Sequence, residues 1–300
     1  MEKLRVILIG LGRIARHHAQ ALMASDRYEL CGVCDLNRER AADLLYQGLP
    51  FSTDFDELIS SVCPDAAVIA TPPQSHVQIA KRCVQRGLHV FVEKPLSDSA
   101  DGCEWFLTTE AASKCTAICH SIYGEEVLWF EQNIRLSSID QIYIQLSDPY
   151  LSAEGSILAD RLSLGGAWLD SGPNALALLS RFVNLTNVSK VSICHEKDTL
   201  TCLPVKTVFR AMADTTALAI DIRWTTDTGS KQYLIQADGH EYLLDSSRQA
   251  VCCDGTLLFQ SAEPDRLTAH YSNFYRLYPR HQPTEQALRS IYELLEKGKN

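Results

Sequence analysis

Apolar residues in the first third of the chain occur in short continuous runs, separated by segments with helical spacing. The runs lie at residues 4–9, 28–34, 66–70, 88–92 and 116–119. Helical patterns lie between them, at 13–24, 37–47, 54–60, 74–86 and 98–112. A continuous apolar run is typical of a strand buried on both faces, and alternation with helices indicates a parallel sheet. We therefore predict a doubly wound α/β domain over residues 1–120.

The pattern changes after about residue 120, where strands follow one another without intervening helices. After a helical stretch at 124–136, strand patterns lie at 141–146, 188–196, 206–214, 217–226, 231–237, 240–246 and 249–260. Consecutive strands form antiparallel sheets, and Asp238-Gly239 suits a hairpin turn. Helical stretches at 173–183 and 284–297 complete this part, the latter amphipathic. Residues 121–300 therefore predict an α+β domain with a large, mostly antiparallel open sheet.

Charge and hydropathy exclude several classes of partner. A net charge of -9 and a pI of about 5.5 argue against broad contact with nucleic acid or anionic membranes. The apolar runs are much shorter than the roughly 18 residues of a membrane span. Met1 leads directly into a strand pattern, so we expect no secretion signal and a cytoplasmic protein.

The eleven cysteines are scattered along the chain, and we interpret them as reduced thiols. Cys31 and Cys34 have C-x-x-C spacing, but they lie within a strand pattern, which favours a structural role over a redox role. The histidines and cysteines do not have the spacing of a zinc site, so we predict no metal.

A glycine-rich turn joins the first strand to the first helix. Its sequence, Gly10-Leu11-Gly12-Arg13-Ile14-Ala15, fits the pattern G-x-G-x-x-[GA]. The first glycine permits the tight turn, the second lets the backbone approach a pyrophosphate, and the alanine allows close packing of helix on sheet. The helix N-terminus would then favour the phosphates, so residues 10–14 are predicted to bind a dinucleotide.

Asp35 directly follows the second strand, where an acidic residue would accept hydrogen bonds from an adenosine ribose. The alternative is a plain turn in which Asp35 caps the helix predicted at 37–47. Under the dinucleotide interpretation NAD is preferred, because Asp35 would repel a 2′-phosphate. Arg38 is close enough in sequence to leave NADP possible.

Two further strand ends carry distinctive residues. Thr71-Pro72-Pro73 follows the third strand, with His76 in the first turn of the next helix. This segment is either a proline-started helix or a wall of a nicotinamide pocket, and the helix dipole would keep His76 neutral. Glu93-Lys94-Pro95 follows the fourth long run, which points a charge or proton donor at the ligand crevice beyond the strand ends.

A third segment, in the second domain, combines glycines with polar side chains. It reads Gly165-Gly166-Ala167-Trp168-Leu169-Asp170-Ser171-Gly172-Pro173-Asn174. Asp170 and Asn174 are four residues apart at the start of a helical stretch and can share one face. A simple helix start capped by Asp170 or Ser171 explains the same residues.

The glycine-rich turn, Glu93-Lys94-Pro95 and the segment 165–174 occur in the same order as in the Gfo/Idh/MocA oxidoreductases. The chain resembles this family over nearly its whole length. The resemblance implies a Rossmann domain followed by an α/β domain with an open antiparallel sheet, and NAD(P)-dependent oxidation of sugars or cyclitols. It also implies that Lys94 is the catalytic lysine, that Asp170 orients the substrate, and that Thr71, Pro72, His76 and Glu93 belong to the cofactor site. A homodimer or homotetramer formed through the second sheet is expected by analogy.

The chain departs from this family at Asn174, where most members have a histidine that acts as general acid and base. Asparagine cannot exchange a proton near neutral pH, which leaves three explanations. Lys94 could transfer the proton, or the substrate could be an aldose oxidised at its more acidic anomeric hydroxyl, or catalysis could be lost in favour of sensing. The D-x-G-x-N variant is similar to bacterial aldose 1-dehydrogenases that act on L-arabinose or D-galactose.

We therefore expect an NAD(P)-dependent dehydrogenase of a sugar or polyol, with Lys94, Asp170 and Asn174 at the reacting centre. A keto-sugar reductase and a non-catalytic NAD or sugar sensor are the alternatives. His120, at the end of a strand, is a candidate sugar contact or a packed histidine. Trp168 is a candidate for stacking on a sugar ring or a core residue.

Overall fold

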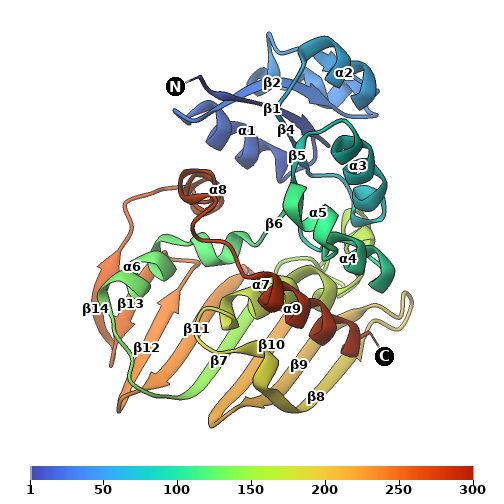
Figure 1. Ribbon diagram of the computed structural model, residues 1–300. Helices are drawn as coiled ribbons and strands as arrows, with labels where there is room; N and C mark the ends of the chain where they lie inside the picture. The colour runs from blue at the N-terminus through green and yellow to red at the C-terminus, as the bar shows by residue number, and fades with distance from the viewer. Residues whose placement is uncertain (1, 300) are drawn as a thin grey trace. The chain divides into compact units, whose positions relative to one another are not determined.

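The computed structural model describes residues 2–299 and separates into two compact units, whose elements Figure 1 labels. The first unit runs to His120 and also includes Leu267–Gln282. The second unit holds Ser121–Arg266 and the remaining C-terminal residues. The sequence boundary at residues 120 and 121 did not foresee the return of 267–282 to the first unit. This return has a packing reason, because Phe274 and Tyr275 are buried against Phe91 of the first unit.

The first unit is built on a six-stranded parallel sheet with spatial order β3-β2-β1-β4-β5-β6. The strands are β1 (Leu4–Ile9), β2 (Tyr28–Cys34), β3 (Phe51–Ser52), β4 (Ala66–Ile69), β5 (His89–Glu93) and β6 (Cys115–Ile118). Strands β1, β4 and β5 are almost wholly buried, as their apolar runs predict. The strand order reverses between β1 and β4, which makes this the topological switch point of a doubly wound sheet.

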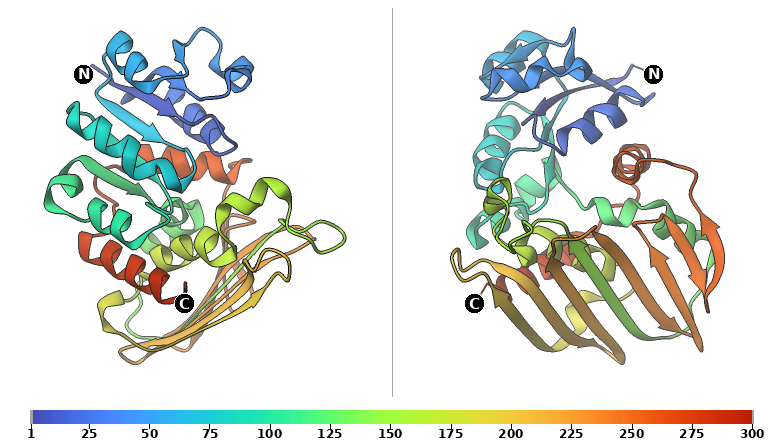
Figure 2. Two further views of the ribbon diagram at one scale, coloured as in Figure 1. Left: turned by 90° about the vertical axis from the view of Figure 1, so that its right-hand side faces the viewer. Right: turned by 180° about the vertical axis from the view of Figure 1, so that it is seen from behind.

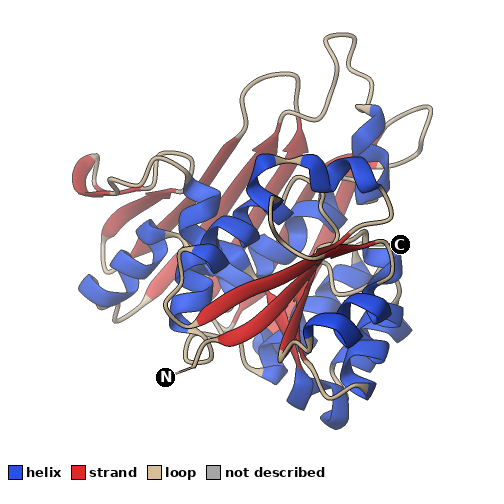
Figure 3. Cartoon of the chain, turned by 90° about the horizontal axis from the view of Figure 1, so that it is seen from above, coloured by secondary structure: helices blue, strands red, loops and turns tan. Residues whose placement is uncertain are grey.

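Helices lie on both sides of this sheet (Figure 3). They are α1 (Ala15–Met23), α2 (Phe55–Val62), α3 (Pro73–Gln85), α4 (Ala100–Phe106), α5 (Thr109–Lys114) and α8 (Arg266–Leu277). The helix predicted at 37–47 is instead two 3₁₀ turns, η1 (Arg38–Ala42) and η2 (Leu44–Tyr46). Asn37 and Asp43 cause this break, since each side chain accepts a backbone N–H two residues later and starts a new turn. The helix predicted at 98–112 is likewise interrupted between α4 and α5.

The second unit is built on an eight-stranded sheet with order β14-β13-β12-β11-β7-β10-β9-β8. Its strands are β7 (Ile139–Asp148), β8 (Val188–Lys197), β9 (Pro204–Ala213), β10 (Thr216–Trp224), β11 (Ser230–Ala237), β12 (His240–Asp245), β13 (Ala250–Cys253) and β14 (Thr256–Gln260). Only the central pair β7 and β10 is parallel, and the other neighbours are antiparallel. The strand predicted at 249–260 is a hairpin, because Asp254 and Gly255 have φ of 47° and 78° and turn the chain. The predicted hairpin turn at Asp238-Gly239 is confirmed.

One face of the second sheet carries the helices of this unit. They are α6 (Glu125–Asn133), α7 (Ala167–Leu179) and α9 (Glu285–Lys297), with the 3₁₀ turns η3 (His120–Tyr123), η4 (Ala159–Leu164) and η5 (Leu185–Asn187). Figure 2 shows α7 and α9 side by side on this face. Residues along β10 alternate between buried and half-buried, which separates a core face from a more open face. The homo-oligomer predicted through this sheet stays a prediction.

Two expectations about the whole chain can be compared with the described residues. Within residues 2–299, the helices are all too short or too polar to cross a membrane. All eleven cysteines carry free thiols. Burial raises the pKa of Cys31 and of Cys34 to about 11, so both stay protonated and unreactive near neutral pH.

Candidate functional site

The glycine-rich turn lies at the switch point between β1 and β4. Gly10 has a φ of +92°, and its N–H donates to the carbonyl oxygen of Cys34 at 2.8 Å. A Cβ atom on Gly10 would lie 2.8 Å from backbone atoms of Ala70 and Thr71. Only glycine fits both the backbone angle and this close approach to the end of β4. The first glycine of the motif is therefore required by the fold itself.

The second glycine has a different environment. In the described part of the chain, no heavy atom outside Gly12 and its two chain neighbours lies within 4 Å of the position that a Cβ on Gly12 would take. Ala15 begins α1 and is fully buried against the sheet. The preceding cap position is Ile14, whose side chain has no hydrogen-bonding group, so it cannot cap the first N–H groups of the helix. Open space beside Gly12 and an uncapped helix start fit a pyrophosphate, which supports residues 10–14, Leu11 and Arg13 included, as a dinucleotide cradle.

Asp35 connects the end of β2 to this turn. Its Oδ2 atom accepts hydrogen bonds from the N–H of Leu11 at 2.7 Å and from the guanidinium of Arg40 at 3.1 Å. Its Oδ1 atom accepts from the N–H of Asn37 at 2.8 Å. The predicted capping role is thus confined to one local turn, while the bond to Leu11 fixes the glycine loop. Sequence reasoning named Arg38, but that side chain lies over the Phe51 ring, and Arg40 is the cation at Asp35.

His76, which the resemblance assigns to the cofactor site, makes hydrogen bonds inside the first unit. The ring is fully buried in the first turn of α3. Its Nε2 atom is 2.8 Å from the carbonyl oxygen of Thr71, and its Nδ1 atom is 3.1 Å from that of Pro95. Burial lowers the pKa of His76, so the ring is neutral and donates one of these two bonds at a time. The residue joins the Thr71-Pro72 loop to the turn that follows Lys94, and its part in the cofactor site stays a prediction.

Glu93 is a buried support for the backbone of Lys94, and its predicted part in the cofactor site stays a prediction. The side chain is 5% exposed, and its Oε2 atom accepts the backbone N–H of Lys94 at 3.1 Å. Its Oε1 atom accepts from the hydroxyl of Tyr271 at 2.6 Å and from Nε2 of His18 at 3.0 Å. Burial raises the pKa of Glu93, but the His18 and Tyr271 hydrogen bonds and the nearby positive charges outweigh it, so the net shift is downward. The carboxylate under Lys94 is therefore ionised.

A second tyrosine extends this buried group. The hydroxyl of Tyr275 lies 2.8 Å from Nδ1 of His18. Because an ionised carboxylate only accepts, His18 donates through Nε2, and the Tyr275 hydroxyl is the partner of its Nδ1 atom. Burial raises the pKa of Tyr275 well above 10, which keeps that proton in place. We call Glu93, His18, Tyr271 and Tyr275 the first buried centre.

Sequence reasoning missed most of this centre. Tyr271 and Tyr275 come from α8, almost 180 residues after Glu93, and His18 comes from α1. A motif search along the chain has no signal for such contacts. His120, a predicted sugar contact, belongs to the same neighbourhood: its ring is 8% exposed and 5.6 Å from the Tyr271 ring, and its Nδ1 atom is 3.3 Å from Nδ1 of His270.

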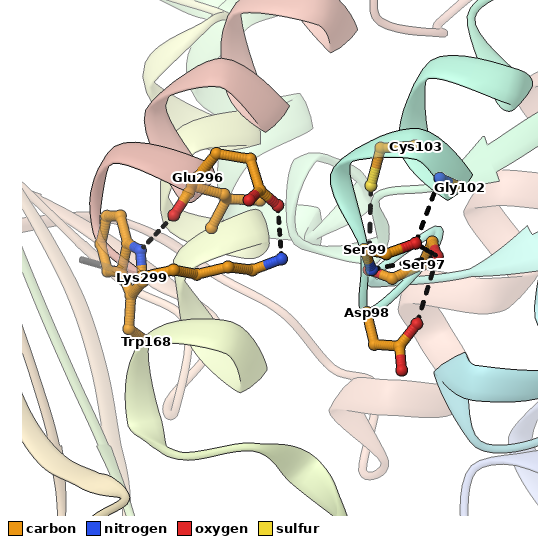
Figure 4. A network of polar contacts seen from close by, with 9 residues as sticks. Ser97, Asp98, Ser99, Gly102, Cys103, Trp168, Glu296 and Lys299 are labelled. Atoms are coloured by element: carbon orange, nitrogen blue, oxygen red, sulfur yellow. Dashed lines mark hydrogen bonds and ion pairs between the residues drawn. The ribbon is translucent and has the colours of Figure 1, made fainter.

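The turn after Lys94 is anchored to the start of α4 (Figure 4). Ser97 Oγ accepts the N–H of Ser99 at 3.2 Å, and Ser99 Oγ accepts the N–H of Gly102 at 3.2 Å. Gly102 leaves no room for a side chain, since a Cβ there would lie 2.1 Å from Ser97 Oγ. Lys94 is half-buried. Glu93 accepts its backbone N–H, and the serine cap at the start of α4 fixes the turn that follows it.

In the second unit, the predicted site residues lie within α7, which begins earlier than expected. Gly166, with a φ of 97°, starts the helix, and a Cβ there would lie 2.7 Å from Pro204. Asp170 is 8% exposed in the first turn, and Asn174 follows one turn later on the same side. Among residues 2–299, no group bonds to the buried Oδ1 atom of Asn174. A buried acceptor of this kind fits a ligand hydroxyl.

Trp168 packs in the core of the second unit, which is one of the two roles predicted for it. The side chain is 1% exposed and stacks on Phe209 with ring centroids 6.0 Å apart. Its Nε1 atom donates to the carbonyl oxygen of Leu295 at 3.1 Å, toward the C-terminal helix, as Figure 4 shows. The indole therefore fixes α9 against α7.

One cluster with metal-binding chemistry lies away from these residues. His240, Cys253 and Asp254 meet at the β12–β13 hairpin, with ligand atoms within 4.8 Å of one another. Asp254 already accepts from His240 at 2.7 Å and from the N–H of Glu241 at 2.9 Å. His240 begins β12, whereas Cys253 and Asp254 come at the end of β13, and only the pairing of these two strands brings them together. Spacing along the chain therefore did not reveal the cluster.

The predicted residues thus form two groups, each described within its own unit. The first comprises the glycine turn, Asp35, Thr71, Pro72 and Lys94, at the carboxyl ends of parallel strands. The second comprises Asp170 and Asn174, on one side of α7.

The part of the chain that holds the first group matches the model of a known protein family. Residues 4–121 match the model of the Gfo/Idh/MocA family, described as an oxidoreductase family with an NAD-binding Rossmann fold. A UDP-N-acetylglucosamine 3-dehydrogenase of Acidithiobacillus ferrooxidans is 37% identical over 101 residues, which are 32% of this chain and 30% of that protein. Glycosyl hydrolase family 109 protein 2 of Akkermansia muciniphila is 29% identical over 156 residues, which are 47% of this chain and 33% of that protein.

Solved structures share the fold of both units. A myo-inositol dehydrogenase from Corynebacterium glutamicum has a TM-score of 0.77 at 19% identity, covering 99% of this chain and 96% of that one. A crystal form of the Acidithiobacillus ferrooxidans 3-dehydrogenase has a TM-score of 0.79 at 18% identity, covering 99% and 97%. In sequence, however, the chain spans about a third of the curated relatives that it matches. Residues 4–121 therefore form a Rossmann-type domain that matches the NAD-binding domain of the Gfo/Idh/MocA oxidoreductase family.

Proposed function

We propose that this protein is an NAD(P)-dependent dehydrogenase that oxidises a hydroxyl group of a sugar or cyclitol. The observation that carries this proposal is the placement of Lys94. It directly follows a central parallel strand, beside the switch point that holds the glycine turn, and its backbone is fixed by the buried Glu93 carboxylate. A purely structural lysine would not need a glutamate, a histidine and two tyrosines beneath it.

The cofactor would be held by the glycine turn, the start of α1, Asp35 and the Thr71-Pro72 loop. When bound, a nicotinamide cofactor supplies the acceptor for the hydride that leaves the substrate carbon. Asp35 is ready to accept a ribose hydroxyl, and its charge disfavours a 2′-phosphate, so NAD is the preferred cofactor. Arg40 covers one oxygen of Asp35 and would reduce that discrimination, which leaves NADP as a weaker cofactor.

Lys94 would accept the proton of the reacting hydroxyl, directly or through water, as the C–H bond breaks. A lysine amine can act as a general base, and the backbone of Lys94 is held in place by the Glu93 carboxylate. Glu93 itself stays ionised and does not take part in the transfer.

Asp170 and Asn174 would orient the substrate. The Asp170 carboxylate accepts from a neighbouring hydroxyl, and the Oδ1 atom of Asn174 accepts from the reacting one. Asparagine neither gains nor loses a proton near neutral pH, so its contribution is confined to position. This places the proton chemistry on Lys94.

The substrate class is supported by the relatives. Two curated relatives are named for oxidation at carbon 3, of UDP-N-acetylglucosamine and of glucose 6-phosphate, and one similar structure is a myo-inositol dehydrogenase. A secondary ring hydroxyl is therefore the leading target. The anomeric hydroxyl of an aldose is the second target, because its higher acidity would compensate for Asn174.

The reverse direction is a specific alternative, since a structure of the same fold is named as a 3-ketoreductase. A keto-sugar would then receive the hydride, and Lys94 would donate the proton. A sensor that binds NAD or sugar without turnover is the rival from outside enzymology. It requires neither Lys94 nor its buried support.

A substrate screen tests the proposal. Purified protein is mixed with NAD or NADP and with aldoses, cyclitols, amino sugars or nucleotide sugars, and nicotinamide absorbance is followed. Turnover of a ring alcohol to a ketone is expected, whereas lactone formation would identify the anomeric target. Oxidation of reduced cofactor by keto-sugars would establish the reverse direction, and a chromogenic glycoside checks for hydrolysis. Saturable binding without any redox turnover would overturn the enzymatic proposal.

A further inference from the structure

The core face of the second sheet contains a lysine that the proposed function does not use. Lys231 on β11 is paired with Leu146 on β7 and faces the same side as Tyr233 and Ile235. Its side chain is 16% exposed, and its Nζ atom lies 2.5 Å from Oδ2 of Asp148. A buried charge is costly unless it is paired and hydrogen-bonded, so such a residue requires a partner network.

Asp148 links this lysine to the helix that carries the predicted substrate residues. It ends β7, and the same Oδ2 atom accepts the hydroxyl of Ser171 at 3.0 Å. Ser171 follows Asp170 in the first turn of α7. One carboxylate oxygen therefore holds both β11 and the turn that presents Asp170. We call Lys231, Asp148 and Ser171 the second buried centre.

The charges around Lys231 come from three elements. Burial lowers its pKa, attraction by Asp148 on β7 and by Asp170 on α7 raises it, and Arg266 at the start of α8 lowers it, with a net downward shift. Asp148 and Asp170 are thus the two carboxylates whose charges act on Lys231. Asn174 brings no charge to this side of α7, which makes the lysine a source of positive charge beside the substrate residues.

We propose that Lys231 is a positioning residue for Asp170, which fixes the first turn of α7 through Asp148 and Ser171 and supplies the positive charge beside the Asp170 carboxylate. This inference rests on the proposed function, because it gives Asp170 a substrate to orient. Lys231 acts through Asp170 and is not assigned a contact with the reacting atoms.

The test uses a double variant, because Lys231→Met alone would leave the buried Asp148 carboxylate without the lysine charge. Replacing both partners of a buried pair is often tolerated by the fold. In the Asp148→Asn, Lys231→Met double variant we expect normal folding and a kcat/KM about 30- to 100-fold lower, since a loosened substrate residue has effects of this order. Lys231→Arg, which keeps a cation beside Asp148, should retain part of the rate, and the pH profile of kcat/KM is measured for each variant.

Lys206→Met is the matched control. Lys206 pairs with Glu196 on strands β9 and β8, where the carboxylate is 68% exposed, so its loss should change neither kcat/KM nor the pH profile. A double variant with the kcat/KM and pH profile of the wild type would overturn the inference.

A second measurement needs no substrate and separates the inference from the proposed function. Urea unfolding of wild type, Lys231→Met, Asp170→Asn and their combination forms a double-mutant cycle. We expect a coupling of at least about twofold in the folding equilibrium constant. Zero coupling would overturn the inference even in an active enzyme. Coupling in a protein that turns over no compound of the screen would support the interaction and reject the dehydrogenase proposal.

Discussion

Both buried centres fix the backbone beside a predicted site residue, but they do so with different side chains. In the first unit, the Glu93 carboxylate supports Lys94 and accepts hydrogen bonds from Tyr271 and His18, and the Tyr275 hydroxyl lies against His18. In the second unit, the Asp148 carboxylate supports the turn of Asp170 and is paired with a full positive charge on Lys231. Each centre lies one residue from a predicted site residue, so both act by fixing the backbone beside it.

The difference follows from the residue that each centre supports. The first centre fixes Lys94, the proposed base, through its backbone N–H, which the Glu93 carboxylate accepts. The second centre fixes the turn of Asp170, the proposed substrate-orienting residue, through the Ser171 hydroxyl, which the Asp148 carboxylate accepts. The first centre therefore positions the proposed base, and the second positions a proposed substrate contact.

Replacing Lys94 should produce the largest effect. Lys94→Met removes the proposed base while the glycine turn and Asp35 remain, so kcat should fall by about 10²- to 10⁴-fold. The affinity for NAD, measured by calorimetry, should stay within about twofold of wild type because the cradle is unchanged. Lys114→Met, at an exposed position in α5, is the control. If Lys94→Met turned over at the wild-type rate, Lys94 would not be the base, and the first buried centre would have no catalytic residue to support.

Glu93→Gln should have the next largest effect and tests the charge of the first centre. Hydrogen bonds to charged groups contribute about 1.5–3 kcal/mol, so the unfolding free energy at pH 7 should fall by about 2 kcal/mol. Because the pKa of Glu93 is lowered on folding, its contribution is present above the unfolded value of about 4.3 and is lost as pH falls through the folded value.

Wild type should therefore lose more stability than Glu93→Gln between pH 5 and pH 3, as measured by urea unfolding. Glu29→Gln is the control, since Glu29 pairs with Arg5 at a surface where both side chains are well exposed. Parallel stability curves for wild type and Glu93→Gln would mean that the carboxylate is not held ionised by its neighbours.

The first unit could be predicted from the sequence to a greater depth than the second. Parallel strands end at one edge of a sheet, so the motif residues Gly10, Asp35, Thr71 and Lys94, each just after an apolar run, had to meet there. No such rule connects Asp148 with Lys231, which are 83 residues apart on neighbouring strands of an open sheet. Their contact depends on strand register, which periodicity alone leaves undetermined.

Even in the first unit, the sequence could not supply what lies beneath the motif. Apolar spacing in 266–277 is weak because its buried residues include His270, Tyr271 and Tyr275, whose polar groups hide the helical face. Glu93 and His76 looked like ligand contacts because strand ends and helix starts face the crevice. Their side chains turn inward, which only the packing of α8 and of the turn after Lys94 decides.

Asp35→Asn should have an intermediate effect on cofactor choice. Asparagine can still accept from Leu11, but it removes the negative charge, so the ratio of kcat/KM for NADP to that for NAD should rise about tenfold. Arg40→Ala should change the ratio in the opposite direction by uncovering the carboxylate. Steady-state rates with both cofactors measure this. If both variants kept the wild-type ratio, Asp35 would serve only to fix the glycine turn.

Tyr275→Phe should give the smallest effect, and it tests the outermost hydrogen bond of the first buried centre. It removes one neutral hydrogen bond to His18, so the unfolding free energy should fall by about 1 kcal/mol. Tyr278→Phe is the matched control: its hydroxyl lies 3.0 Å from Nε2 of His89, outside the centre. Both variants should lose similar stability, but only Tyr275→Phe should lower kcat, by about threefold, because His18 then holds Glu93 and the Lys94 backbone less firmly. If Tyr275→Phe and Tyr278→Phe had equal kcat values, the contact between Tyr275 and His18 would contribute to packing alone. The support of Lys94 would then come from Glu93 and Tyr271.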